Sequence, residues 1–350
     1  MEEGYFSKIV VQWYESYRRD LPWRKSQDPY KIWLSEIILQ QTRVAQGLPY
    51  YQKIVAAHPN VSSLARAREH DILRLWQGLG YYSRARNLHR CAKEISKRLG
   101  GKFPSTFEAL RELPGIGDYT AAAIASFAFN QPVAVVDGNV YRVLSRVFGL
   151  HEDIARPATK RLFAQLANRI ISKDNPGEHN QAIMEFGALH CVPQNPKCDD
   201  CPFSAMCVAR LRGLQQELPV KSRKPKVRKR YFHYVILRHG NRVLMKRRNG
   251  KDIWHGLYDF HLIESGGRQK TESVVRGTEW FDPKNPMAIS KSIRHLLTHQ
   301  ELRVAFAEIE IKTLREFERL SHELGLHPYS SRKIESLPKP ILIQQYLSKR

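Results

Sequence analysis

The stretch Leu113-Pro-Gly-Ile-Gly-Asp-Tyr-Thr-Ala-Ala-Ala-Ile124 decides the fold of the first part of the chain. Gly115 and Gly117 permit positive φ and leave neighbouring backbone N–H groups uncovered by a Cβ atom. A second helix is expected from Thr120, and free amides at a helix N-terminus bind phosphate. The stretch therefore predicts a tight turn between two helices that binds a DNA backbone. Two glycines alone leave an ordinary helical hairpin open as the alternative.

The helix before this turn is expected to start at Ser105, because Glu108 three residues later would complete a capping box. Pro114 ends that helix. The helical pattern extends from Tyr5 to about Arg210, with turns marked by proline and glycine and without a convincing alternating strand. We therefore expect an all-α first domain.

The composition indicates a globular protein with a polyanionic partner. Its 350 residues are 42% hydrophobic, and 57 Lys and Arg against 34 acidic residues give a formal charge of +23. No apolar run approaches the ~20 residues of a membrane span, and Met1-Glu-Glu-Gly lacks the features of a signal peptide. We expect a cytoplasmic, DNA-associated monomer without a membrane partner. A basic surface that is merely solvated is the alternative.

Glu36 lies in the apolar middle of an expected helix. Asp28 and Pro29 supply an N-cap and a first-turn proline, and the helix runs to Thr42 with large apolar residues on both sides of Glu36. The carboxyl group either faces water, which is the commoner case, or lies in a dry pocket. In the pocket its pKa would rise and it would hold a proton at neutral pH.

The stretch from Leu75 to Leu88 combines two glycines with adjacent tyrosines and two arginines. This composition suits stacking on bases and holding phosphates. A glycine-containing bend whose tyrosines are buried explains the same residues equally well.

Asp137 is expected to cap the helix that follows it, a role worth roughly 1 kcal/mol that would by itself explain an aspartate here. One helix and one connector separate Asp137 from the glycine turn. The carboxylate is therefore expected to return beside whatever the turn holds.

Four of the five cysteines crowd into one loop, at Cys191, Cys198, Cys201 and Cys207. They form a poor disulfide framework for a reducing compartment and a good metal site. Four thiolates ligate either Zn²⁺ or a 4Fe–4S cluster, and their number alone does not separate the two. Zinc sites more often contain two CxxC pairs, whereas here only Cys198 and Cys201 form one, which favours the cluster.

The pattern changes after a basic, proline-punctuated run from Leu214 to Arg230, which indicates a linker. Two alternating runs joined by His239-Gly-Asn241 then carry a hairpin signature. Further strands are expected at 257–263 and 302–311, and helices near 290–297 and 341–347. The sequence thus predicts a separate α+β domain.

Five motifs, taken in order and separation, resemble the adenine DNA glycosylases of the MutY type, within the helix-hairpin-helix glycosylase superfamily. They are Trp33-Leu-Ser-Glu-Ile-Ile-Leu-Gln-Gln-Thr42, Gly78-Leu-Gly-Tyr-Tyr-Ser-Arg-Ala-Arg-Asn87, Leu113-Pro-Gly-Ile-Gly117, Val136-Asp-Gly-Asn-Val140 and the cysteine loop. The resemblance covers nearly the whole chain. It implies a base excision repair enzyme that removes adenine mispaired with 8-oxoguanine or guanine from double-stranded DNA.

The resemblance implies catalytic roles for four residues. Glu36 would be the general acid that protonates adenine, and Asp137 would stabilise the oxocarbenium-like sugar, kept ionised by a helix dipole. The two carboxyl groups are thus expected to have opposite pKa shifts. Asn139 and Tyr119 match positions that orient water, Asp137 or the sugar. The endonuclease III branch has a Schiff-base lysine where this chain has Tyr119, so base excision without efficient strand cleavage is expected.

The resemblance also implies that the target base leaves the duplex and enters a pocket. The matching positions are Gln41 and Tyr81 for wedge residues, Trp23, Arg24 and Gln181 for the adenine pocket, and Gly115 and Gly117 for the DNA backbone. The family has either glutamine or glutamate at the last pocket position.

The C-terminal domain resembles the Nudix-like domain with which this family recognises 8-oxoguanine. The residues Leu296 to Gln300 align with a family loop that usually reads Phe-Ser-His, so Thr298 and His299 are the candidates for contacting the lesion. Arg319 stands where a Nudix box requires a magnesium-binding acid. Pyrophosphate hydrolysis is therefore not expected.

The predicted fold class is multidomain. An all-α helix-hairpin-helix glycosylase domain over 1–213 contains the 4Fe–4S cluster loop at 191–207, a basic linker covers 214–230, and an α+β Nudix-like domain covers 231–350. One rival is a mismatch thymine glycosylase, which shares the Tyr119 and Asp137 pattern but ends near the cysteine loop. The other rival is a non-catalytic DNA-binding protein, against which the pairing of Glu36 with Asp137 argues.

Overall fold

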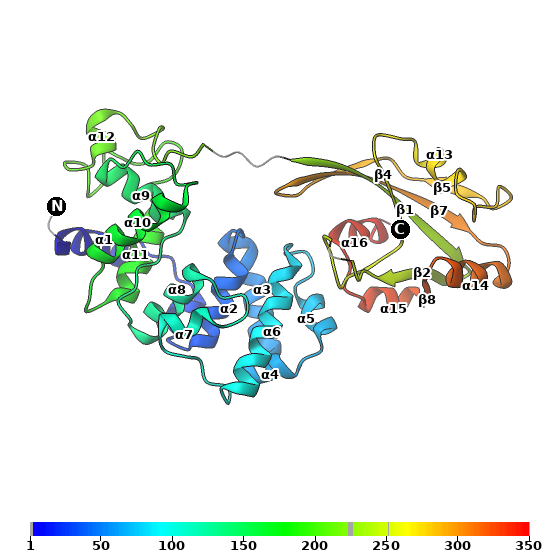
Figure 1. The fold of residues 1–350 in the computed structure, drawn as a ribbon, viewed down its shortest axis with the longest axis horizontal. Helices are drawn as coiled ribbons and strands as arrows, with labels where there is room; N and C mark the ends of the chain where they lie inside the picture. The colour runs from blue at the N-terminus through cyan, green and yellow to red at the C-terminus, as the bar shows by residue number, and fades with distance from the viewer. Residues whose placement is uncertain (1–2, 223–226, 251, 350) are drawn as a thin grey trace. The chain divides into compact units, whose positions relative to one another are not determined.

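The computed structural model describes residues 3–222, 227–250 and 252–349, and the chain divides into two compact units (Figure 1). The first unit comprises 1–66 and 87–223, and the second comprises 67–86 and 224–350. Residues 223–226 of the predicted linker lie outside the described residues, and the first strand begins at Arg228. The predicted domain boundaries stay a prediction. Among the described residues, no helix combines the length and hydropathy needed to cross a membrane.

The first unit is helical, as the sequence predicts, and its described residues contain no strand. Its helices are α1 (Glu3–Tyr17), η1 (Pro22–Lys25), α2 (Pro29–Leu39), α3 (Val44–Ala57), α4 (Val61–Arg66), α6 (Tyr82–Arg98, which begins in the second unit), α7 (Phe107–Arg111), α8 (Asp118–Phe129), α9 (Gly138–Phe148), α10 (Pro157–Ile170), α11 (Pro176–Leu189) and α12 (Val208–Arg212).

Local capping explains where the functional helices begin. The Asp28 side chain accepts the N–H of Tyr30 at 2.9 Å, which confirms the predicted start of α2. The predicted capping box at Ser105 is wrong by one residue. Thr106 caps α7 and accepts the N–H of Ala109 at 3.3 Å. Adjacent Ser and Thr are both good N-caps, so the sequence does not decide between them.

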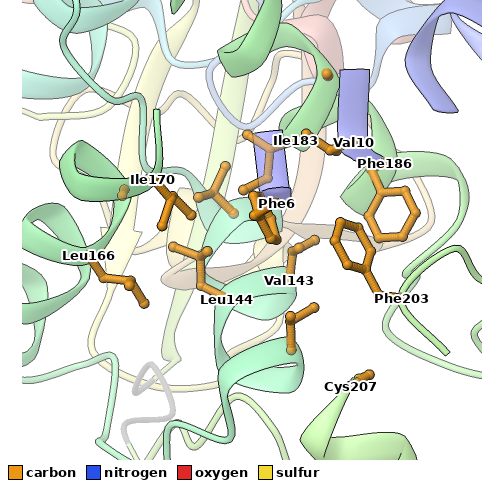
Figure 2. Close-up of a cluster of buried hydrophobic side chains, with 14 of the residues drawn as sticks. Phe6, Val10, Val143, Leu144, Leu166, Ile170, Ile183, Phe186, Phe203 and Cys207 are labelled. Atoms are coloured by element: carbon orange, nitrogen blue, oxygen red, sulfur yellow. The ribbon is translucent and has the colours of Figure 1, made fainter. Parts of the chain in front are cut away.

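A single apolar cluster fixes α9 against α1, α10 and α11 (Figure 2). Phe6, Val143 and Phe186 are its fully buried centre, with Phe203 from the cysteine loop stacked on Phe6 at 4.9 Å between ring centroids. Each such side chain contributes roughly 1.5–3 kcal/mol through burial. The cluster therefore holds the start of α9, where Asp137 lies, in a fixed place.

The second unit is a mixed sheet with helices, so the expected α+β class is confirmed. Its elements are α5 (Glu69–Leu75), β1 (Arg228–His239), β2 (Arg242–Arg247), β3 (Tyr258–Asp259), β4 (His261–Ser265), α13 (Thr271–Arg276), β5 (Met287–Ile289), β6 (Ile293–Leu296), β7 (Gln300–Glu310), α14 (Leu314–Glu323), β8 (His327–Ser330), α15 (Ser331–Ser336) and α16 (Ile341–Leu347). The order β3-β2-β1-β7-β5 forms the main path, while β4, β6 and β8 pair with β1, β7 and β2.

The centre of the sheet is the parallel pair β1 and β7, in a register that aligns Arg228 with Gln300. The run Phe232 to Leu237 is buried almost throughout, because both faces of this strand are covered. The predicted hairpin at residues 239–241 is confirmed, with His239 opposite Arg242. The strand expected at 302–311 and the helix expected at 341–347 are also present.

The helix expected near 290–297 is wrong. Ile293–Leu296 forms β6, which pairs antiparallel with β7 and aligns Leu296 with Glu301. The apolar residues in this run are spaced as in a helix, but the backbone groups find their partners on β7 instead. The turn between the strands is Thr298 and His299, closed by the Leu297 N–H donating to the Gln300 carbonyl at 2.8 Å.

The segment 67–86 belongs to the second unit, which the sequence does not predict. Arg247 pairs with Glu69 at 2.7 Å, and Arg86 donates to the carbonyl of His255 at 2.6 Å. Both contacts join residues far apart in the chain. The stretch with the two glycines and two tyrosines is thereby attached to the sheet domain.

Candidate active site

Glu36 is buried within α2, with only 7% of the residue exposed, so the solvent-facing alternative is wrong. Burial raises the pKa of its carboxyl group to about 7, with the charge of Asp137 acting in the same direction. A hydrogen bond from Tyr119 and the charge of Arg24 lower it. The carboxyl group can therefore hold a proton near neutral pH.

Tyr119, in the first turn of α8, is the direct partner of Glu36. Its hydroxyl group donates to Oε2 of Glu36 at 2.7 Å. Burial, followed by the charges of Glu36 and Asp137, raises the pKa of Tyr119 well above its ordinary value. The phenol therefore stays protonated and leaves Oε1 as the oxygen of Glu36 that is free to carry a proton.

Asp137 caps α9, as predicted, by accepting the N–H of Val140 at 2.8 Å on Oδ1. The side-chain amide of Asn139 donates to Oδ2 at 2.8 Å. Burial raises the pKa of Asp137, while these hydrogen bonds oppose the rise. The expected opposite pKa shifts of the two carboxyl groups are thus wrong, because burial dominates for both. What distinguishes them is the larger number of donors that stabilise the charged form of Asp137.

Asn139 is oriented by two residues that the sequence reasoning missed. Arg142 donates to Oδ1 of Asn139 at 2.9 Å and to the carbonyl of Gly187 at 2.6 Å. A Cβ atom on Gly187 would lie 2.7 Å from the Cβ of Asn139, so only glycine permits this approach of α11 to α9. The spacing of Asn139 and Arg142, three residues apart on one helix face, is the signal that the sequence offered.

One cavity of about 640 Å³ collects seven of the predicted residues, a size that suits a small-molecule or base ligand. They are Trp23, Arg24, Glu36, Tyr119, Asp137, Asn139 and Gln181. A larger cavity of about 830 Å³ shares Arg24 and Gln181 with it but is lined by neither Glu36 nor Asp137. The smaller cavity is therefore the candidate active site.

The glycine turn before α8 has the expected form at one of its two glycines. Gly115 has φ +80°, and a Cβ there would meet the Cβ of Asn87 at 2.8 Å. Gly117 is the N-cap of α8 with φ −99°, so it does not use the positive φ that glycine permits. Among the described residues other than its chain neighbours, no atom lies within 4 Å of the place where its Cβ would be, so the amides at the start of α8 are open to approach.

Gln41 and Tyr81, the predicted wedge residues, share a left-handed backbone conformation with φ of 53° and 49°. Such values are uncommon for residues other than glycine and concentrate at functional sites. Neither residue lines the cavity that contains Glu36. Within the second unit, Tyr81, Thr298 and His299 instead line a separate cavity of about 350 Å³, where the hydroxyl groups of Tyr81 and Thr298 form a hydrogen bond.

The four cysteines of the loop line one small cavity together with Arg146. Arg146 donates to Sγ of Cys191 at 3.4 Å and to the carbonyls of Val192 and Pro193 at 2.7 and 3.0 Å. A buried cation thus stands beside the sulfur atoms. Among the described residues, no group of three or more His, Cys, Asp or Glu side chains is arranged to hold a single metal ion.

Comparison with known proteins shows the family to which the chain belongs. A family model described as HhH-GPD superfamily base excision DNA repair protein matches residues 34–169, and a NUDIX domain model matches 233–349. An adenine DNA glycosylase of Buchnera aphidicola (subsp. Schizaphis graminum) is 32% identical and aligns over 96% of each chain. The chain belongs to the adenine DNA glycosylase family.

The human adenine DNA glycosylase is 42% identical over 61% of this chain and 41% of its own length. The solved structure of a thermostable thymine-DNA glycosylase is 29% identical, with a TM-score of 0.55, and covers 59% of this chain and 95% of that chain. The resemblance seen in the motifs is therefore confirmed. The chain combines the helical repair fold with a Nudix-like mixed sheet.

Proposed function

We propose that this protein removes adenine mispaired with 8-oxoguanine or guanine in double-stranded DNA. The reaction is hydrolysis of the N-glycosidic bond of a flipped-out deoxyadenosine. The observation that carries the proposal is the buried Glu36, whose pKa is raised to about 7 in a cavity shared with Asp137 and Tyr119. A proton donor and a second carboxyl group are thus available in one base-sized site.

Glu36 supplies the proton that adenine needs in order to leave. Adenine is a poor leaving group as an anion, so protonation of its N7 lowers the barrier to breaking the bond to the sugar. The Tyr119 hydroxyl occupies Oε2 of Glu36, which directs the proton to Oε1. The same tyrosine has no amine with which to form a Schiff base, so the product is a base-free site in an uncut strand.

Asp137 stabilises the positive charge that develops on the deoxyribose. Its carboxylate is fixed by the start of α9 and by Asn139, so no reorganisation is needed when the charge appears. Arg142 orients Asn139 by donating a hydrogen bond to its Oδ1. These residues together orient the anionic group toward the reacting sugar.

The remaining predicted residues bind the DNA and the flipped-out base. The amides around Gly115 and Gly117 bind a phosphate, and Trp23, Arg24 and Gln181 receive the adenine. Gln41 and Tyr81 enter the base stack, a role supported by their left-handed backbones. Thr298 and His299 contact the 8-oxoguanine.

The four cysteines would hold a 4Fe–4S cluster, which would cross-link the loop from Cys191 to Cys207. The four thiols line one cavity beside Arg146, and the presence of only one CxxC pair, Cys198 and Cys201, supports a cluster over one zinc ion. We expect a yellow-brown protein with about four irons per chain, and loss of solubility or DNA affinity in Cys198→Ala. A colourless protein with one zinc contradicts this assignment.

Glycosylase assays on duplexes that contain A:8-oxoG, A:G and T:G test the function. Release of adenine from the first two, with T:G intact and no strand cleavage before alkali treatment, is the expected result. Thymine release would favour the thymine glycosylase alternative, and binding without release would favour a non-catalytic DNA-binding protein.

A further inference from the structure

Glu185 is a buried carboxylate at the edge of the active-site cavity for which neither the motifs nor the mechanism above has a use. It lies in α11, and only 1% of the residue is exposed. Arg19 donates its backbone N–H, Nε and Nη2 to this carboxylate at 3.0, 2.8 and 2.6 Å. Arg24 adds Nη1 and Nη2 at 3.0 and 2.7 Å. Five N–H groups from one loop thus converge on a single side chain.

These contacts fix the wall that receives the base. Arg24 also donates to the carbonyl of Arg19 at 3.2 Å and lies over the ring of Tyr14 at 5.5 Å from its centroid. The Tyr14 hydroxyl in turn donates to Oε1 of Gln181 at 2.8 Å. Arg24 and Gln181, the two polar residues predicted to meet adenine, are therefore tied to one another through Glu185 and Tyr14.

Glu185 also balances charge beside the general acid. Although burial raises its pKa, the hydrogen bonds from Arg19 and Arg24 bring it down to about 2, so Glu185 is ionised at neutral pH. Two arginines and one glutamate leave a net charge of +1 in this group. The titratable and charged groups that line the cavity with Glu36 are Tyr119 from α8, Asp137 before α9, Arg24 from η1, Arg43 before α3, and Arg19 with Glu185, and of these Tyr119, Asp137 and Arg24 act directly on Glu36. Removing the Glu185 charge would leave +2 on the two arginines, one of which is Arg24.

We propose that Glu185 is a positioning residue, which holds Arg19 and Arg24 at the wall of the adenine pocket and neutralises one of their two charges. The proposal rests on the function proposed above and deepens it. The Glu185 carboxylate accepts its hydrogen bonds from Arg19 and Arg24, so it acts through Arg24 on the base and through its charge on Glu36. A purely structural ion pair would also bind the loop to α11, but it would leave the titration of Glu36 unchanged.

A set of charge variants separates the two roles. The pKa of Glu36 is measured in the DNA-free enzyme by NMR titration of ¹³C-carboxyl-labelled glutamate, with the signal assigned from its loss in Glu36→Gln. We expect Glu185→Gln to lower this pKa by about one pH unit and Arg19→Met to raise it by a similar amount. The double variant restores the net charge of +1 and is expected to bring the pKa back close to the wild-type value. Glu178→Gln, on the same helix, is the matched control and should leave it unchanged.

Single-turnover release of adenine from an A:8-oxoG duplex is the second measurement. Glu185→Gln should lose about tenfold or more in rate at pH 7 while its Kd for the duplex changes only a few-fold. A folded Glu185→Gln with wild-type rate and an unchanged pKa of Glu36 overturns the proposal. If that variant does not fold, an unchanged pKa in Arg19→Met overturns it equally. A wild-type enzyme without adenine release would instead contradict the proposed function, since the NMR titrations do not depend on activity.

Discussion

At the scale of single residues, Glu36 shows how burial keeps a carboxyl group protonated near neutral pH. Burial raises the pKa of its carboxyl group from the ordinary 4.5 to about 7, so the protonated form is present up to neutral pH and is lost above it. Because the proposed mechanism uses the protonated form, the rate should fall as the pH rises through about 7. If the same carboxylate acted as a base instead, the rate would rise with pH over this range.

Asp137→Asn is expected to fold normally and to lose at least about 100-fold in the rate of adenine release. Asparagine caps helices as well as aspartate does, so α9 should keep its start, but the neutral amide cannot stabilise a cationic sugar. Circular dichroism and thermal unfolding check the fold, and single-turnover assays check the rate. A folded variant with normal turnover would return Asp137 to a purely capping role.

At the scale of elements, the glycine turn offers a matched pair of substitutions. Gly115→Ala should lower stability by about 1 kcal/mol or more, since alanine is strained at φ +80° and its Cβ would press on Asn87. Gly117→Ala meets no such obstacle, because its φ is −99° and the space beside it is open. It should keep a near-wild-type Tm and weaken DNA binding by covering the amides of α8.

Thermal unfolding and Kd measurements on duplex DNA check this pair. Equal DNA affinity in Gly117→Ala and the wild type would argue against phosphate binding at the turn. Equal Tm values for the two variants would argue against the strain assigned to Gly115.

The elements that the sequence predicts correctly are those with local signals. Asp28 and Asp137 cap their helices by accepting N–H groups from the turn that follows each of them. The run of apolar and polar residues at 302–311 predicts the long strand β7. The sequence predicts a helix where β6 lies, because the spacing of so few apolar residues does not distinguish a helix from a strand. The pairing with β7 decides for the strand. The burial of Glu36 is equally undecidable from the sequence, since it depends on packing against the loop at Arg24 and against α8 and α9, which are distant in the chain.

The missed site residues share this cause. Gly187 and Glu185 act through contacts of α11 with α9 and with the loop before α2, so nothing in their own neighbourhood marks them, whereas Arg142 has only its spacing from Asn139 as a signal. The motif positions were found because their residue types are unusual where they stand. Supporting residues are ordinary in sequence and become visible in the packing.

At the scale of the whole molecule, the second unit includes the segment 67–86, which limits how its role can be tested. Removing the chain after Lys221 would also strip Glu69, Gln77 and Arg86 of their partners at Arg247, Lys339 and His255. A truncated enzyme would thus confound lesion recognition with the loss of Tyr81 positioning. Substitutions in the turn between β6 and β7 avoid this problem.

Thr298→Ala combined with His299→Ala should lower the preference for A:8-oxoG over A:G by about tenfold to a hundredfold. A hydrogen bond that only the oxidised base satisfies is worth roughly 1–3 kcal/mol of discrimination. Cleavage of A:G should change little, because the catalytic cavity is formed within the first unit. Rates on both duplexes, measured in parallel, check the ratio. Equal losses on the two would point to general DNA holding by this turn.

The most direct test of the central claim is single-turnover release of adenine from an A:8-oxoG duplex between pH 5.5 and 9, by the wild type and by Glu36→Gln. We predict that the wild-type rate falls as the pH rises through about 7, and that Glu36→Gln has less than about 1% of the wild-type rate at neutral pH while binding the duplex within a few-fold. Substantial release by Glu36→Gln, or a wild-type rate that rises through pH 7, would contradict the assignment of Glu36 as the general acid.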